Sequence, residues 1–216
     1  MLKYYESGNF DSKTKVILFH GFGADAQDLL PLGELIEPTK HWVFPDGPLE
    51  IPIGFAATGR AWWTIDFNRM STSDYDFTQE RPRALEQSFA AVQKFILSLK
   101  TPISDIVLGG FSQGGMMALH AYLNLPEKPK GLILLSSALI NKAEQKIKIE
   151  TRGGGTFYLA HGVHDQVLPY KCGQQLETFL TQSGMKGKLH TFQGSHEIPM
   201  SVVSQVKDYL KQLTDK

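Results

Sequence analysis

Residues 105–117 read Asp-Ile-Val-Leu-Gly-Gly-Phe-Ser-Gln-Gly-Gly-Met-Met and contain the pattern Gly110-x-Ser112-x-Gly114. The pattern follows an apolar, strand-like run and opens a helix-like run, which is the setting of a nucleophilic serine on a sharp strand-to-helix turn. Glycines are needed there because side chains two residues before and after the serine would clash with the turn. The alternative, a serine that only caps the helix, would require neither glycine. We therefore predict that Ser112 is a nucleophile at the carboxyl end of a strand.

Short apolar segments recur along the chain and predict the strands of a sheet. They are Lys15–Phe19, Trp42–Phe44, Asp105–Leu108, Gly131–Leu135, Thr156–Ala160 and Leu189–Phe192. Most are rich in Val, Ile and Leu without polar alternation, which is typical of parallel strands buried on both faces. The first residues, Leu2–Tyr5, predict an added antiparallel edge strand.

Amphipathic segments between these strands predict helices. In Arg83–Lys100, apolar residues recur at spacings of three and four and form one stripe. The segments Gln113–Leu125, Tyr170–Ser183 and Pro199–Leu213 show the same pattern. Strands that alternate with helices predict an α/β fold, with a mostly parallel central sheet and helices on both faces.

The length and charge of the chain narrow the classes of protein. A chain of 216 residues fits one domain, so we expect residues 1–216 to form a single unit. The 22 Lys and Arg residues balance 22 Asp and Glu residues. Nucleic-acid binding is not expected, because it needs clustered excess cations. The most lysine-rich run, Asn141 to Glu150, also carries glutamates and is predicted as a solvated connection.

Three sequence features bear on location. Cys172 is the only cysteine, so no intrachain disulfide can form. Residues 1–15 lack the apolar core of a signal peptide, and no run of about 18 apolar residues predicts a membrane span. We expect a cytoplasmic protein without stable membrane insertion. The sequence leaves open whether the chain forms a homodimer.

Residues 45–82 show no clear periodicity and are interrupted by prolines and glycines. Loops of this length inside a compact domain are usually functional or disordered. This segment carries Phe55, Trp62, Trp63 and Phe67, so it is too apolar for a disordered linker. We predict a folded excursion over a binding site.

The acidic partner of Ser112 should follow it in the chain, because this kind of turn precedes first an Asp or Glu and then a His. Asp165 is the only aspartate between Ser112 and the last histidine. It follows the predicted strand Thr156–Ala160, and loops at the carboxyl ends of parallel strands gather functional residues. The competing acids are Glu127, Glu144 and Glu150 in polar connections and Glu177 in a predicted helix.

Two histidines, His190 and His196, follow Asp165. His190 lies inside the predicted strand Leu189–Phe192, whereas His196 lies in the loop before the last predicted helix. A base must reach both the nucleophile and the leaving group, so we predict His196 as the general base and His190 as a sheet residue. Asp165 would then fix the imidazole tautomer and stabilise its cation.

Backbone N–H groups are expected to form an oxyanion hole. One donor is Gln113, at a helix start where free N–H groups and the helix dipole favour negative charge. The second is Phe22 in the loop His20-Gly-Phe-Gly, for which a plain glycine turn is the alternative. The motif His161-x-x-His164-Asp suggests a metal, but it has no helical spacing and no apparent third ligand. No metal or cofactor is expected.

Apolar side chains near these groups predict an acyl site. The candidate substrate-binding residues are Trp62, Trp63, Val167 and Leu168, beside Phe22. Such a lining favours short to medium acyl chains over charged substrates. Ordinary packing is the alternative role for each aromatic residue.

Four motifs in this order resemble the phospholipase/carboxylesterase family, which includes acyl-protein thioesterases and small bacterial carboxylesterases. They are His20-Gly-Phe-Gly, Gly110-Phe-Ser-Gln-Gly-Gly, His161-Gly-x-x-Asp165-x-Val-x-Pro169 and Gly194-x-His196. The resemblance implies the α/β-hydrolase fold, a triad of Ser112, Asp165 and His196, and oxyanion donors at Phe22 and Gln113. Trp62 or Trp63 matches an aromatic residue beside the acyl pocket.

The resemblance implies a serine esterase that hydrolyses carboxylic esters or thioesters through an acyl-enzyme. An acyl-protein thioesterase or lysophospholipase is the first alternative, and a serine peptidase or a non-catalytic binding protein on the same fold is less favoured. Two departures from the family pattern concern substrate selection. Ala24 separates the loop glycine from Asp25, and residues 61–66 read Ala-Trp-Trp-Thr-Ile-Asp instead of the commoner Trp-Phe-Asp.

Overall fold

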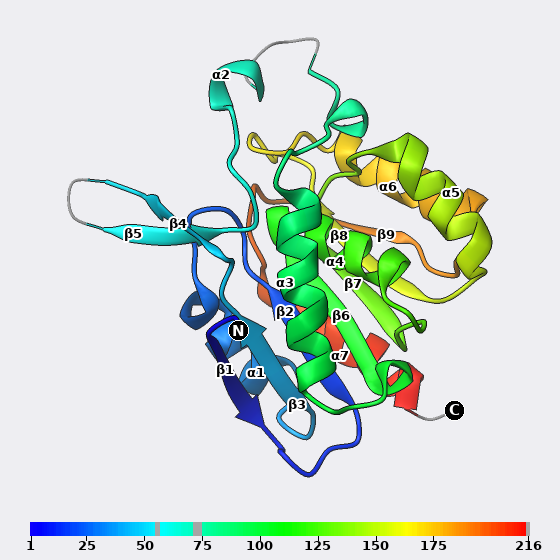
Figure 1. The fold of residues 1–216 in the computed structure, drawn as a ribbon. Helices are drawn as coiled ribbons and strands as arrows, with labels where there is room; N and C mark the ends of the chain where they lie inside the picture. Colours follow the sequence, from blue (N-terminus) through cyan, green and yellow to red (C-terminus); the bar gives the residue numbers. More distant parts are fainter. Residues whose placement is uncertain (55–56, 71–74, 215–216) are drawn as a thin grey trace.

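The structure is a computed structural model that describes residues 1–54, 57–70 and 75–214. Its central sheet has seven strands in the order β1-β3-β2-β6-β7-β8-β9 (Figure 1). These strands are β1 (Tyr4–Gly8), β2 (Lys15–Phe19), β3 (His41–Pro45), β6 (Ile106–Phe111), β7 (Gly131–Leu135), β8 (Phe157–Gly162) and β9 (Leu189–Phe192). Neighbouring strands are parallel except for β1 and β3. The prediction of a mostly parallel sheet with an antiparallel edge strand is confirmed.

Helices cover both faces of this sheet. One face carries α1 (Ala26–Ile36) and α7 (Met200–Thr214), and the other carries α3 (Leu85–Ser98), α4 (Gln113–Asn124), α5 (Lys142–Arg152) and α6 (Lys171–Gln182). The side chains of β2 divide between two buried clusters: Ile17 and Phe19 pack under α3 and α4, whereas Val16 and Leu18 pack under α1 and α7. The strand is apolar throughout because both of its faces are buried.

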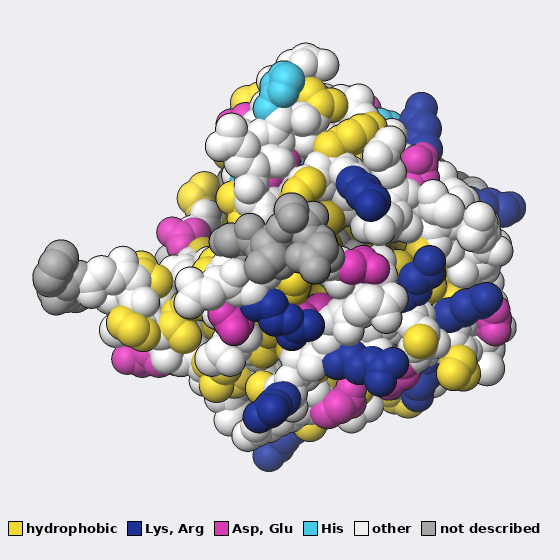
Figure 2. Space-filling model, turned by 90° about the horizontal axis from the view of Figure 1, so that it is seen from above, with side chains coloured by type: hydrophobic (Ala, Val, Ile, Leu, Met, Phe, Trp, Pro, Cys, Tyr) yellow, Lys and Arg dark blue, Asp and Glu magenta, His cyan; other side chains and the backbone are white. Residues whose placement is uncertain are grey.

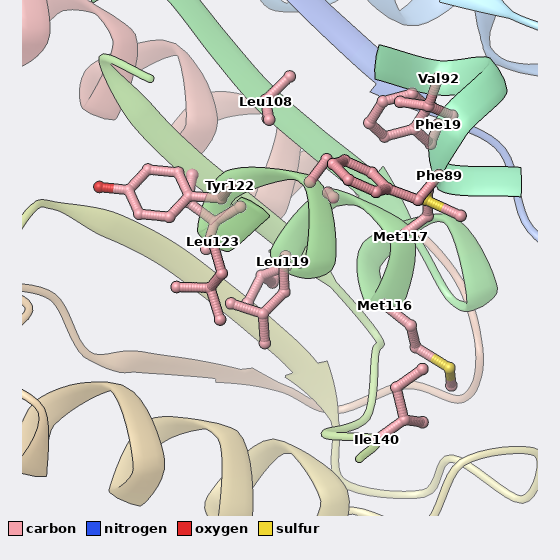
Figure 3. Close-up of a cluster of buried hydrophobic side chains, with 14 of the residues drawn as sticks. Phe19, Phe89, Val92, Leu108, Met116, Met117, Leu119, Tyr122, Leu123 and Ile140 are labelled. Atoms are coloured by element: carbon pink, nitrogen blue, oxygen red, sulfur yellow. The ribbon is translucent and has the colours of Figure 1, made fainter. Parts of the chain in front are cut away.

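Figure 3 shows part of the first cluster, in which Phe89 and Val92 of α3 lie beside Met117 of α4 and Phe19 of β2. Val92, Met117 and Phe19 are fully buried. This packing holds α4 on the sheet directly behind the Ser112 turn, so the position of the turn depends on the main core.

The structure corrects one expectation about local structure and gives the internal structure of a second segment. Residues 141–150 are not a loose connection, because most of them belong to the helix α5. Residues 45–82 contain the hairpin of β4 (Leu49–Pro52) and β5 (Thr58–Ala61), the short helix α2 (Phe67–Met70) and a 3-10 turn at Phe77–Gln79. The hairpin projects from the body of the molecule (Figures 1 and 2). Phe55 lies outside the described residues.

No helix within the described residues is both long and apolar enough to cross a bilayer.

A buried histidine, His120, lies on α4 in the main core. Its ring packs edge-on against Phe89, with ring centroids 5.0 Å apart. Its Nε2 atom lies 3.2 Å from Glu86 Oε1, without hydrogen-bond geometry. Burial outweighs the nearby acidic groups and lowers the pKa of His120 to about 4. The imidazole is therefore neutral in the folded protein at pH 7.

Acidification should destabilise the wild type more than the variant His120→Leu. The unfolded histidine takes up a proton near pH 6.5, whereas the folded one resists protonation until about pH 4. Because the folded-state pKa is the lower one, the stabilisation is present above pH 6.5 and is lost as the pH falls towards 4. The full difference corresponds to about 3 kcal/mol of unfolding free energy. Urea unfolding of both proteins across this range measures the effect, and parallel pH dependences would contradict it.

Candidate active site

The turn between β6 and α4 holds Ser112 at a positive φ, with φ 54° and ψ −120°, which non-glycine residues rarely adopt. A non-glycine residue in such a conformation costs about 1–3 kcal/mol, and such residues cluster at functional sites. A Cβ atom on Gly110 would lie 2.2 Å from the backbone of Gly114, and one on Gly114 would lie 2.1 Å from the Phe19 carbonyl oxygen. Only glycine fits at either position. The Ser112 side chain makes no capping hydrogen bond to α4, which argues against a purely capping role.

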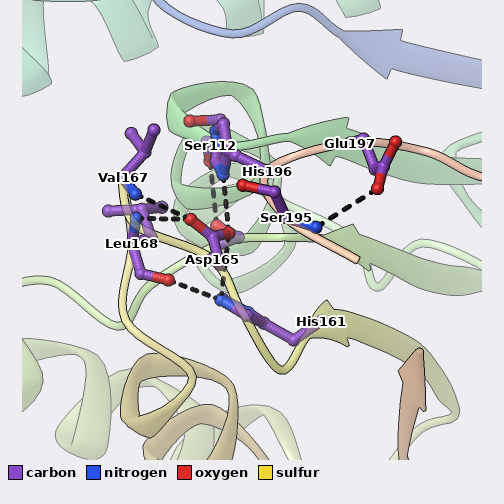
Figure 4. A network of polar contacts seen from close by, with 9 residues as sticks. Ser112, His161, Asp165, Val167, Leu168, Ser195, His196 and Glu197 are labelled. Carbon is purple, nitrogen blue, oxygen red and sulfur yellow. Dashed lines mark hydrogen bonds and ion pairs between the residues drawn. The ribbon is translucent and has the colours of Figure 1, made fainter. Parts of the chain in front are cut away.

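Asp165 and His196 meet from the loops that follow β8 and β9. The Nδ1–H of His196 donates to Asp165 Oδ2 at 2.7 Å (Figure 4). The other carboxylate oxygen accepts hydrogen bonds from the backbone N–H groups of Val167 and Leu168, at 2.9 and 2.8 Å. His161 Nε2 donates to the Leu168 carbonyl oxygen at 2.8 Å and lies 3.4 Å from Asp165 Oδ2. Both oxygens of the Asp165 carboxylate therefore accept hydrogen bonds.

These contacts keep Asp165 ionised. Burial alone would raise its pKa, but the contacts with His161, His196 and the Leu168 amide outweigh burial and hold the pKa of Asp165 well below its usual range. A carboxylate at this place fixes the proton of His196 on Nδ1 and leaves Nε2 as the basic nitrogen. The imidazole also packs against Phe111, with ring centroids 4.7 Å apart, so its plane is fixed next to the serine turn.

A cavity of about 320 Å³ connects these groups, and both Ser112 and His196 line it. Its volume lies at the lower end of the range of small-molecule sites, which is about 300–1,000 Å³. The wall is mainly apolar and includes Trp63, Ile65, Phe77, Met116, Val167 and Leu168. Much of it comes from residues 63–70 and 75–80, in the second part of the segment that showed no periodicity in the sequence.

The loop that follows β2 lies against the serine turn. A Cβ atom on Gly21 would lie 3.3 Å from both Phe111 Cδ1 and Ser112 Cβ, so a glycine lets the loop approach closely. Phe22 and Gln113 both line the cavity. Gln113 is the first residue of α4, ahead of the hydrogen bonds that the helix makes internally. Within the described residues, the Phe22 amide donates to no backbone carbonyl oxygen.

The structure gathers the predicted site residues around one cavity, with one exception. Ser112, Gln113, Phe22, Trp63, Val167, Leu168 and His196 line it, and Asp165 lies behind His196. Trp62 is not among the described lining residues. Its ring is fully buried between Phe19 and His20, with centroids 5.1 and 5.2 Å away. The prediction that Trp62 binds substrate is therefore corrected: its side chain is enclosed in the core.

Sequence reasoning missed two residues of the site. His161 was considered as a metal ligand, yet its side chain contacts Asp165. Met116 belongs to the buried core and also lines the cavity, a role that the sequence did not indicate. His190 lies in β9 and stacks on Tyr158 at 4.9 Å, away from Asp165, as predicted. Among the described residues, no cluster of His, Cys, Asp and Glu side chains could hold a metal ion.

The strand order, the serine on its strained turn and the two converging loops define the class of α/β-hydrolase proteins. A family model described as Phospholipase/Carboxylesterase matches residues 5–214. The chain belongs to this family and is a carboxylic ester hydrolase. The family expected from the four sequence motifs is confirmed.

Several known proteins are similar to the chain. Acyl-protein thioesterase 1 of Candida albicans is 27% identical over 225 residues, which cover 95% of this chain and 94% of that protein. Acyl-protein thioesterase 1 of Cryptococcus neoformans is 27% identical over 189 residues, which cover 84% and 79%. The crystal structure of esterase PE8 is 26% identical, with a TM-score of 0.83 and 98% of both chains covered. A Bacillus cereus carboxylesterase, 19% identical with a TM-score of 0.76 over 99% and 95% of the chains, shares the fold.

Proposed function

We propose that the chain hydrolyses esters or thioesters of short to medium acyl chains by a serine mechanism. Ser112 is the nucleophile, His196 the general base and Asp165 the carboxylate that orients it. One observation carries the proposal: Ser112 and His196 line the same cavity, and a carboxylate lies 2.7 Å behind the imidazole. The buried, unpaired Cys172 fits the reducing cytoplasm as the place of action.

In the first half-reaction, Ser112 Oγ attacks the acyl carbonyl carbon while His196 Nε2 accepts the hydroxyl proton. The Asp165 carboxylate stabilises the resulting imidazolium. The amides of Phe22 and Gln113 donate to the oxyanion, and each such donor contributes about 3–4 kcal/mol. His196 then returns the proton to the departing alcohol or thiol, which leaves Ser112 acylated. In the second half-reaction, water replaces the leaving group, and the same steps release the acid.

The cavity supports an uncharged acyl group as the substrate. Its wall is mainly apolar, and a volume of about 320 Å³ leaves room for a chain of limited length. On the face seen in Figure 2, basic and acidic side chains are interspersed, so neither sign dominates. These features support a substrate with a neutral, short to medium acyl chain.

Truncation of Trp63 should weaken the binding of longer acyl chains. The ring lines the cavity and is only 4% exposed, so Trp63→Ala removes apolar wall. Lost contact with two methylene groups corresponds to about 1.5 kcal/mol, or about tenfold in KM, for long p-nitrophenyl esters. The KM for the acetate should change little. Steady-state kinetics across the ester series measures this, and an unchanged chain-length preference would refute the role.

A panel of esters, thioesters and peptide amides tests the proposed function. We expect hydrolysis of p-nitrophenyl esters and acyl thioesters, with a maximum at short or medium chain length, and no cleavage of amides. Cleavage of peptides in preference to esters would support the serine peptidase instead. Absence of turnover on all three classes would support a binding protein.

Acylated proteins are a second candidate substrate class. The fungal relatives are named acyl-protein thioesterases, and the match to the Candida albicans protein covers 95% of this chain. An S-acylated peptide, compared with a small thioester of the same acyl chain, separates the two substrate classes. A higher kcat/KM on the peptide would favour protein deacylation, and a higher value on the small thioester would favour a small-molecule esterase.

A further inference from the structure

The loop that carries Phe22 is bound to the segment that carries Trp62. The indole N–H of Trp62 donates to the His20 carbonyl oxygen at 2.9 Å. His20 Nδ1–H donates to the Gly21 carbonyl oxygen at 2.7 Å, so Nε2 accepts the Gly47 N–H, at 2.8 Å. Burial lowers the pKa of His20, which favours this neutral tautomer. Gly47 and Trp62 therefore both bond to His20, which lies two positions before Phe22, the first proposed oxyanion donor.

Backbone bonds join the same two segments on the other side of Phe22. Gly23 N–H donates to the Arg60 carbonyl oxygen, and Arg60 N–H donates to the Ala24 carbonyl oxygen, both at 2.9 Å. The contact is close: a Cβ atom on Gly59 would lie 2.0 Å from the Gly23 carbonyl oxygen. Phe22 is therefore flanked by two attachment points to one segment.

Hydrogen bonds also join the segment that carries Trp62 to Gln113, the second proposed donor. The side-chain amide of Gln113 is buried, accepts the Trp62 N–H at 2.9 Å and donates to the Trp63 carbonyl oxygen at 2.8 Å. Ser88 of α3 donates to the Trp62 carbonyl oxygen. Trp62 thus links the two proposed donors: its indole bonds to the Phe22 loop, and its backbone bonds to the Gln113 side chain.

We propose that Trp62 is a positioning residue that sets the separation of the two oxyanion donors. Its indole fixes the Phe22 loop and its main chain is fixed by Gln113, so one rigid side chain spans the two halves of the oxyanion hole. The inference rests on the proposed function. Trp62 would then affect the stability of the transition state, although its side chain does not touch the substrate. A misplacement of about 1 Å at a catalytic group can cost about 100-fold in rate.

The test compares Trp62→Phe with Trp42→Phe. Trp42 is a matched control, because it is also fully buried and its indole N–H also donates to a backbone carbonyl, that of Glu37, at 2.9 Å. Trp62→Phe should lower kcat for p-nitrophenyl butyrate by about 10–100-fold with little change in KM. The inhibition constant of an alkyl trifluoromethyl ketone, to which the serine adds to form a tetrahedral oxyanion, should rise by a similar factor. Trp42→Phe should lower Tm comparably while kcat and the inhibition constant stay near wild type.

Each outcome of this comparison has a distinct meaning. A wild-type kcat in Trp62→Phe, or equal losses in the two variants, would overturn the inference and leave the proposed function intact. Absence of turnover in the wild type would overturn both. Should Trp62→Phe fail to fold, Gln113→Met removes both side-chain bonds to the segment and keeps the backbone donor. It should also lower kcat more than it raises KM, and an unchanged kcat would contradict the inference.

Discussion

Ser112→Ala should lower kcat for ester hydrolysis by about 10⁴–10⁶-fold while the protein stays folded. The substitution removes only the hydroxyl, which makes no capping bond to α4, so the turn and its glycines are unaffected. The loss is large because no acyl-enzyme can form, and only the oxyanion donors and substrate binding remain. Burst and steady-state kinetics with p-nitrophenyl esters measure it, alongside Tm.

Ser136→Ala is the matched control for this variant. Ser136 is also a serine with positive φ, at 42°, and its buried hydroxyl has no hydrogen-bond partner within the described residues. Its loss should leave kcat near wild type. Substantial turnover in Ser112→Ala, or equal losses in the two variants, would show that Ser112 is not the nucleophile.

Asp165→Asn should lower kcat by about 10⁴-fold with little change in the fold. The amide keeps the size of the carboxylate but can donate a hydrogen bond to His196 Nδ1, which favours the tautomer with its proton on Nε2. The nitrogen that should accept the serine proton is then already protonated. The negative charge that stabilises the imidazolium is lost as well. Single-turnover kinetics at saturating substrate isolates this chemical step.

Glu177→Gln controls for the competing acid. Glu177 lies on α6, and its carboxylate accepts the Leu189 N–H at 2.8 Å, so it supports β9. Its neutralisation should leave kcat near wild type. A normal kcat in Asp165→Asn together with a large loss in Glu177→Gln would assign the acid to Glu177.

The serine turn could be predicted because its constraints are local. Gly110 and Gly114 are required by contacts within the turn and with the neighbouring strand, and both are visible in the sequence as glycines. The meeting of Asp165 and His196 could be predicted because the carboxyl ends of parallel strands share one edge of the sheet. Chain order and strand position were then enough to choose them among competing residues.

The distinction between Trp62 and Trp63 could not be predicted. Both lie in a segment without periodicity, so no pattern indicates which side chain turns inward. The direction is set by partners distant in the chain. The indole N–H of Trp62 donates to the His20 carbonyl oxygen, 42 positions away, and its backbone N–H donates to the Gln113 side chain, 51 positions away. Such contacts appear only in three dimensions.

Two of the longer helices, α5 and α1, were missed for different physical reasons. α5 is mostly charged, with only Gln145 and Ile149 buried, so its apolar stripe is too narrow to read. α1 contains Pro31, a residue that usually breaks a helix. It forms nevertheless, with a capping box in which Asp25 and Asp28 satisfy each other's backbone N–H groups. Asp25, which departs in position from the family pattern, thus serves as a helix cap.

Covalent labelling with a fluorophosphonate, followed by mass spectrometry of the peptides, probes the activated serine most directly. The reagent phosphonylates a serine only where a base and an oxyanion hole act on it together. One adduct on Ser112 is expected in the wild type, retained in Ser136→Ala and nearly abolished in Asp165→Asn. An unlabelled but folded wild type, or an adduct on a different residue, would contradict the triad of Ser112, His196 and Asp165.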